Sequence, residues 1–114
     1  MPHFIIDCSK QIIELKSPED IMQKVYDAAD LTRLFLPEQI KVTINPFQYY
    51  NTGNTHNNFI HVFANIMEGR NTDQKANLSK QIITVLKTML PEVPIISINI
   101  RDFEKATYCN KEMV

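Results

Sequence analysis

The feature that most constrains the fold of this chain is a pattern that occurs twice. Each copy runs from a strand-like segment through a helix-capping residue and an amphipathic, helix-like segment to a second strand-like segment. Corresponding residues of the two copies stand 55 positions apart: Phe4 and Phe59, Ser17 and Thr72, Leu31 and Leu86, Ile40 and Ile95. Strand–helix–strand repeats at one separation indicate duplicated β-α-β units, each with parallel strands and a right-handed crossover. We therefore predict a two-layer α+β fold, with a four-stranded mixed sheet and both helices on one face.

In the first copy, residues 3–8 place side chains alternately on two sides, which predicts a strand. The segment "SPED" at 17–20 is typical of a helix start, with a serine cap and a proline at the first helical position. The helix then has one apolar face and ends before Pro37; that face comprises Ile21, Val25, Ala28, Ala29 and Thr32. Residues 40–45 alternate again, and Pro46 should end this second strand or confine it to an edge.

In the second copy, "NFIHVFANI" at 58–66 predicts a strand and "IISINI" at 95–100 another. The helix between them should be capped by Thr72 or Asn71 and closed by Pro91 and Pro94. Its predicted apolar stripe consists of Leu78, Ile82, Val85, Leu86 and Met89. The polar segment 48–57 between the copies is a predicted loop.

These units fit one domain over residues 1–114, with units at about 2–46 and 57–101 and a C-terminal tail at 102–114. Helices on one side leave the other sheet face uncovered. The strand 58–66 nevertheless carries apolar side chains on both faces, Phe59 and Phe63 on one and Ile60, Val62 and Ile66 on the other. An apolar strand on an uncovered face predicts burial against another subunit, and therefore an oligomer.

Composition excludes several classes of function. Twelve Lys and Arg against 13 Asp and Glu, without a like-charge block, argue against a nucleic-acid or membrane partner. No apolar run is long enough to span a bilayer, and no secretory signal is evident. Cys8 and Cys109 form no disulfide framework, so we expect a reduced, cytoplasmic protein. Only two glycines occur, and no phosphate-binding loop is present.

The three histidines do not form a metal-binding motif, and no nucleophile–histidine pair is recognisable. We therefore expect no metal. The aromatic residues of the two connecting segments, Phe35, Phe47, Tyr49 and Tyr50, are interpreted as core or interface residues, although "PFQYY" could wall a pocket.

Pro2 is the candidate catalytic residue, since methionine before a small residue such as proline is normally removed. The free proline would carry a secondary amine, and α-amines titrate near neutral pH, at about 7.7–8.0. Burial or nearby cations would lower that pKa and produce a general base. A retained Met1 would instead turn the Pro2 nitrogen into an amide with no usable lone pair. Taken alone, a proline at position 2 commonly has no chemical role.

Two cations are candidate substrate ligands. Arg70 lies in "MEGRNT", between a strand and a helix cap, where loops of such units present ligand-binding groups, and arginine binds carboxylates bidentately. Lys41 lies on the polar side of the second strand. A solvated loop arginine and an ordinary edge lysine are the common alternatives, and Arg101 could simply flank the rim of the sheet.

Together these residues support a resemblance. "PHFIIDCSKQI" at 2–12 resembles the N-terminus of the 5-carboxymethyl-2-hydroxymuconate isomerase family of the tautomerase superfamily. The likeness continues through "LFLPEQIKV", "FIHVFANIMEGR" and the following helix, and so covers nearly the whole chain.

The resemblance implies a homotrimer whose sheets pack together inside the helices. It also implies a cofactor-independent isomerase of aromatic-compound degradation, acting on an unsaturated 2-hydroxy or 2-oxo dicarboxylate such as 5-carboxymethyl-2-hydroxymuconate. By position, Pro2 would be the base and Arg70 would hold a substrate carboxylate. Lys41 falls where the family has a second arginine, and lysine lacks the planar fork of that residue. Two alternatives stay open: a tautomerase of another 2-oxo acid, such as an aromatic pyruvate, and a non-catalytic trimeric binding protein.

Overall fold

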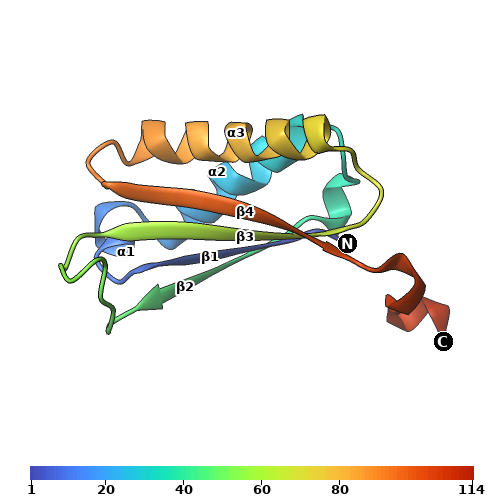
Figure 1. Cartoon of the computed structure of the whole chain (residues 1–114), viewed down its shortest axis with the longest axis horizontal. Coiled ribbons are helices and arrows are strands. Elements are labelled where there is room, and N and C mark those ends of the chain that lie inside the picture. The colour runs from blue at the N-terminus through green and yellow to red at the C-terminus, as the bar shows by residue number, and fades with distance from the viewer.

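The computed structural model describes residues 1–114 and shows one four-stranded sheet with its two long helices on the same face (Figure 1). The strands are β1 His3–Ser9, β2 Lys41–Phe47, β3 Phe59–Met67 and β4 Ile95–Phe103. The helices are α1 Ile12–Leu15, α2 Pro18–Leu31 and α3 Thr72–Met89, and 3₁₀ turns occur at Pro37–Gln39, Lys105–Thr107 and Lys111–Met113.

The sheet has the strand order β2-β1-β3-β4. β1 is parallel to β2, β3 is parallel to β4, and the two pairs meet in the centre through antiparallel β1 and β3. Each parallel pair is joined by one long helix, α2 in the first and α3 in the second. The predicted fold class is therefore confirmed.

The single separation of 55 residues is wrong in detail. Strand partners are His3 and Lys41 in the first unit but Phe59 and Ile95 in the second, so the first crossover is two residues longer. Starts of β1 and β3 are consequently 56 positions apart, whereas those of β2 and β4 are 54 apart. An odd separation exchanges the two faces of a strand. Accordingly Phe4 is fully buried, whereas Phe59 is only half-buried.

The separation of 55 residues does not hold in the helices either, since Leu31 is 70% exposed whereas Leu86 is buried.

The two long helices begin with the predicted capping groups. Ser17 accepts a hydrogen bond from the Asp20 backbone N–H and has Pro18 at the first helical position. Of the two caps considered for α3, Asn71 is the one used, in a reciprocal capping box with Gln74.

The core lies between the sheet and the helices. It contains alternate residues of the central strands and one stripe from each long helix: Phe4, Ile6 and Cys8; Ile60, Val62, Ala64 and Ile66; Ile21, Val25, Ala28 and Ala29; Leu78, Ile82 and Leu86. Thr32, Val85 and Met89, which were predicted for the same stripes, are only partly buried.

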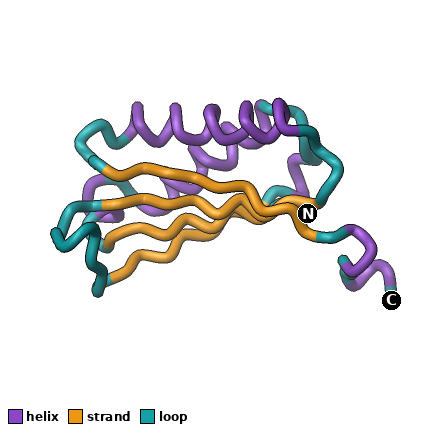
Figure 2. Tube along the Cα trace, in the orientation of Figure 1, coloured by secondary structure: helices purple, strands orange, loops and turns teal.

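One element was not predicted, and all four strands continue one to three residues past their predicted ends. The short helix α1 follows β1 and was not predicted. β2 continues through Pro46 to Phe47, which is possible because β2 is an edge strand and the missing N–H of proline costs no central ladder bond. β4 continues to Phe103, and beyond it the chain leaves the sheet at the end where the N-terminus lies (Figure 2).

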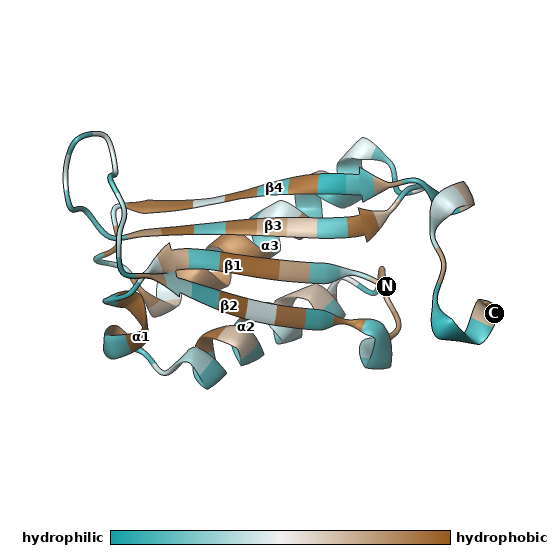
Figure 3. Ribbon diagram, turned by 90° about the horizontal axis from the view of Figure 1, so that it is seen from below, coloured by the Kyte–Doolittle hydropathy of each residue, from teal (hydrophilic) through white to brown (hydrophobic).

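The other face of the sheet carries no helix, and Figure 3 shows apolar and polar residues interspersed along its strands. By strand alternation and register, this open face includes Ile5 and Asp7 of β1, Thr43 and Asn45 of β2, Phe59, His61 and Phe63 of β3, and Ser97, Asn99 and Arg101 of β4. The predicted placement of Phe59 and Phe63 opposite Ile60, Val62 and Ile66 is confirmed. None of the helices combines the length and the apolar character that crossing a membrane requires.

Candidate active site at the chain start

The start of the chain is held at one end of the sheet. Pro2 is buried directly before β1, and its carbonyl accepts a hydrogen bond from the Lys41 backbone N–H at 3.0 Å. This bond continues the parallel ladder between β1 and β2 by one residue. It therefore also fixes the first residue of β2 beside the chain start.

Arg70 lies at the same end of the sheet, in the turn that follows β3. The turn that carries it contains Gly69 with φ +122°, a conformation that side chains other than that of glycine rarely adopt. The guanidinium donates to the Leu34 carbonyl at 2.6 Å and to the Met67 carbonyl at 3.2 Å. Arg70 thus ties the connection between α2 and β2 to the end of β3.

An aromatic ring completes this arrangement. The Arg70 guanidinium carbon lies 5.1 Å from the centre of the Phe35 ring, within cation–π range. Phe35 in turn meets the buried Phe4 edge-to-face, with ring centres 6.0 Å apart. The sequence pattern predicts only a core or interface position for Phe35. Its contact with Arg70 could not be read from the chain, because 35 residues separate the two.

Lys41 differs from Arg70 in having no partner. Its side chain is exposed and makes no hydrogen bond or ion pair, while the single ion pair of the structure joins Lys75 to Asp102 at 2.9 Å. His3, which lies beside Lys41 in the sheet, contacts the Thr43 hydroxyl at 3.0 Å through Nε2. Burial and the Lys41 charge lower the pKa of His3.

The electrostatic environment of the chain start favours a neutral amine. In this structure the amino group belongs to Met1, and its pKa is lowered by desolvation first, then by the charges of Arg70 and Lys41. Both candidate cations therefore act on the amino terminus. The structure brings together Pro2, Arg70 and Lys41, which are far apart in the sequence.

Two hollows flank the chain start. A cavity of about 130 Å³ is lined by Met1, Pro2, Leu34, Phe35, Leu36, Gln39, Met67 and Arg70. A larger hollow of about 550 Å³ is lined by Met1, Lys41, Phe103, Glu104, Thr107, Tyr108, Cys109 and Asn110. The residues of the C-terminal tail form no recognisable motif, so the sequence does not predict their place beside the chain start.

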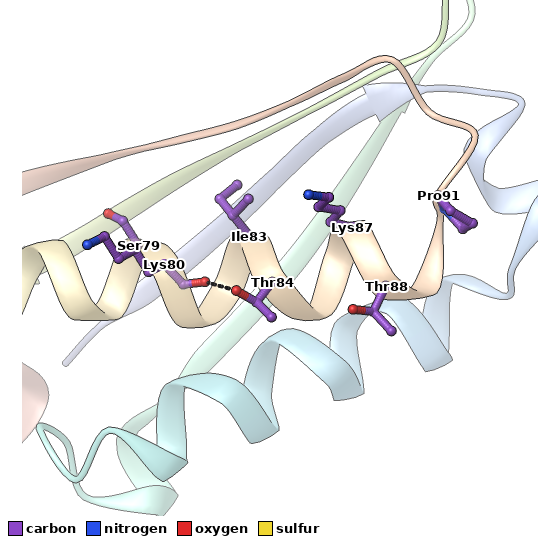
Figure 4. A pocket seen from close by; sticks show the side chains of 7 residues that line it. All are labelled: Ser79, Lys80, Ile83, Thr84, Lys87, Thr88 and Pro91. Carbon is purple, nitrogen blue, oxygen red and sulfur yellow. Dashed lines mark hydrogen bonds between the residues drawn. The ribbon is translucent and has the colours of Figure 1, made fainter.

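A hollow of about 630 Å³ along α3 is not a candidate active site (Figure 4). Its lining is the outer side of one helix, with Lys80 and Lys87 exposed and the Thr84 hydroxyl bound to the Lys80 carbonyl. Its lining has no carboxylate or histidine that could act as an acid or base beside its hydroxyl groups. Nowhere in the chain do three or more His, Cys, Asp or Glu side chains gather to hold a metal ion.

The fold and the site define a class. Several solved structures share this fold of paired β-α-β units in one four-stranded sheet. A 5-carboxymethyl-2-hydroxymuconate isomerase from Deinococcus radiodurans R1 superposes with a TM-score of 0.84, at 19% identity over 96% of this chain and 88% of that chain. The F6 fused 4-OT wild-type asymmetric trimer gives a TM-score of 0.79, at 15% identity over 96% and 92%.

A third neighbour differs in reaction. N1, a member of the cis-3-chloroacrylic acid dehalogenase family, gives a TM-score of 0.75, at 14% identity over 96% of this chain and 80% of that chain. At such identities the neighbours show the fold alone. No match was found among curated proteins.

The family itself is shown by the sequence. The family model of 5-carboxymethyl-2-hydroxymuconate isomerase matches residues 2–112, and this chain belongs to that family. It is accordingly an isomerase of the tautomerase superfamily.

Proposed function

We propose that this isomerase moves a proton within an unsaturated 2-hydroxy or 2-oxo carboxylate such as 5-carboxymethyl-2-hydroxymuconate, with Pro2 as the general base and without a cofactor. The observation that carries the proposal is the convergence of two cations on a buried chain start. Desolvation, Arg70 and Lys41 all lower the pKa of the amino terminus. A base that is neutral at physiological pH needs such an environment.

The proposal requires removal of Met1, which leaves the amine on the Pro2 nitrogen. That nitrogen lies one residue further into the structure than the present amino group, where Pro2 is buried beside Arg70. We therefore expect its pKa to be lowered by the same causes as that of Met1. The narrow cavity on this side holds the reacting end of the substrate.

The reaction then proceeds in two proton transfers. The neutral Pro2 nitrogen takes a proton from the substrate, and the electrons left behind form a dienolate. The Pro2 ammonium returns the proton to a different carbon, which restores the amine. Arg70 has three N–H groups left after its two carbonyl contacts, and it and Lys41 bind carboxylate and stabilise the dienolate charge.

We further propose that the chain forms a homotrimer through the open face of the sheet. This face bears Phe59, Phe63 and Ile5, which are only partly buried and are covered by no helix, and apolar surface left in contact with solvent favours association. The fused 4-OT proteins of similar fold are trimers. Assembly would place the helices outside and the sheets inside.

Activity toward an aromatic 2-oxo acid is the second candidate, because Lys41 stands where the family has an arginine and offers a point charge without the bidentate fork. Comparison of kcat/KM for enols with one and with two carboxylates separates the two candidates. A preference for the monocarboxylate would favour the aromatic substrate.

The test combines intact mass with an enol–keto assay across pH. Protein lacking Met1 should show kcat/KM rising with pH through one pKa below about 7.7–8.0, because the neutral amine is the active form. Pro2→Ala should lower kcat/KM about 10²- to 10⁴-fold. Arg70→Ala should move the pH profile to higher pH, since one cation no longer lowers the pKa.

Lys80→Gln on the outer side of α3 is the matched control and should leave the pH profile unchanged. Undiminished activity in protein that retains Met1 would exclude Pro2 as the base. Activity unaffected by both Pro2→Ala and Arg70→Ala would favour the non-catalytic binding protein.

A further inference from the structure

The hollow on the Lys41 side of the chain start has an outer wall that comes from the C-terminal tail. Six of its eight lining residues belong to the segment 103–110, and the other two are Met1 and Lys41. The cavity on the Arg70 side holds about 130 Å³, a few times the volume of a water molecule, whereas ligand pockets commonly exceed about 300 Å³. Met1 lines both hollows, so the larger one, of about 550 Å³, offers the room for the body of a ligand whose end reaches the chain start.

The tail is anchored where it forms this wall. The Glu68 backbone N–H donates to the Phe103 carbonyl at 3.1 Å, and the Glu68 carboxylate accepts from the Lys105 backbone N–H at 2.7 Å. The Tyr108 ring stacks on Phe103, with centres 5.4 Å apart and planes 27° apart. Tyr108 is consequently half-buried although most of the residues around it are exposed.

Two residues that line the hollow have side-chain donors without an acceptor. The Lys41 ammonium has no partner, and the Tyr108 hydroxyl accepts from the Asn110 amide at 3.4 Å while its own O–H has no acceptor. Glu104 also lines the hollow, but it makes no ion pair with Lys41. A free ammonium and a free phenolic O–H in one hollow suit a carboxylate, which accepts from both.

We propose that Tyr108 is a specificity-determining residue of this site, which selects ligands whose far end carries a second carboxylate. The reacting end lies at Pro2, and the far carboxylate binds between the Lys41 ammonium and the Tyr108 hydroxyl. The tail thus sets both the length and the charge of the ligand. As a statement about the enzyme's substrate this rests on the proposed function, whereas the ligand selection itself can be tested by binding alone.

The experiment uses two unreactive probes of equal carbon number, adipate and hexanoate, with the full chain and calorimetric Kd values. We expect adipate to bind at least about tenfold more tightly than hexanoate. Tyr108→Phe, which keeps the stack on Phe103, should remove most of this preference while changing the hexanoate Kd less than about twofold. Lys41→Gln should do the same.

Tyr49→Phe is the matched control, because Tyr49 is 86% exposed in the loop after β2 and lies outside the hollow. An adipate preference that is unchanged in Tyr108→Phe, or absent from the unaltered chain, would overturn the inference. Binding selectivity that persists in protein without turnover would instead contradict the proposed function and leave the assignment of Tyr108 intact.

Discussion

The two faces of the sheet are made by the same strands yet differ in composition and in what covers them. On the helix side, β1 and β3 present only apolar side chains and all are buried. On the open side, His61 contacts the Ser97 hydroxyl and the Asn99 amide oxygen, and Arg101 lies 4.2 Å from the centre of the Phe63 ring. The helix-side face is fully covered by α2 and α3 of the same chain, whereas the open face combines aromatic rings with hydrogen-bonded polar pairs.

This difference shows how a two-layer fold divides its tasks. Non-directional burial against α2 and α3 provides the stability of the chain, because apolar area removed from water dominates folding. The open face is the one that the proposed trimer would bury, and the polar pairs within it would then specify the orientation of the copies. The candidate site lies at the end of the sheet where β1 and β2 begin, with Pro2 buried and Lys41 exposed.

The largest effect is expected from a charge on the open face. Ile5→Asp places a carboxylate beside Asp7, on the same side of β1. Burial of such an unpaired charge in an interface costs several kcal/mol, so the assembled form should dissociate to monomers that keep their secondary structure. Sedimentation velocity measures this, and Ile83→Asp on the outer side of α3 is the control. An unaltered chain that is monomeric would contradict the proposed trimer.

Substitutions in the helix-side core should lower the free energy of unfolding. Phe4→Ala removes a fully buried ring from the core and should lower the free energy of unfolding by about 3–5 kcal/mol. Tyr49→Ala removes an exposed ring and should change it by less than about 0.5 kcal/mol. Urea denaturation compares the two. Similar losses in both variants would show that the helix side is not the dominant core.

Cys8 belongs to the same helix-side core, and its thiol should make the stability of the fold depend on pH. Burial, and then the charge of Asp7, raise the pKa of this thiol to about 11. Between the unfolded thiol pKa of about 8.5 and 11, the unfolded chain has lost a proton that the folded chain keeps, so stability falls as pH rises. The loss is up to about 1.4 kcal/mol per pH unit. Cys8→Ala should lack this component of the pH dependence, which urea denaturation at pH 8 and pH 10 measures; equal slopes would contradict it.

The smallest effect is expected where the site meets the helix side. Phe35→Leu removes the ring under the Arg70 guanidinium and should cost about 1 kcal/mol of stability. It should also move the pH–activity profile to higher pH, because a less firmly held Arg70 lowers the pKa of the amine less. Phe35→Tyr should restore the profile, and Phe47→Leu in β2 should not alter it. A profile unchanged in Phe35→Leu would show that the ring does not position Arg70.

Much of this protein could be predicted from residues close together in the chain. Helix caps, proline stops and strand alternation depend on neighbours within four positions, so Ser17, Pro18 and the faces of β1 and β3 were predicted correctly. The choice of Asn71 over Thr72 and the length of each crossover required the docked structure. A one-residue change of separation reverses a strand face, and composition alone does not detect it.

The sequence by itself determined the order of elements, the paired β-α-β units, the two-faced strand β3 and the candidates Pro2, Arg70 and Lys41. Only the tertiary structure decided that Arg70 is held by the Leu34 carbonyl while Lys41 stays free, and that the tail closes the hollow beside them. The physical reason is the distance along the chain over which each interaction acts. Period and capping act along the chain, whereas the contacts of a cation with a distant carbonyl exist only after strands and connections have packed.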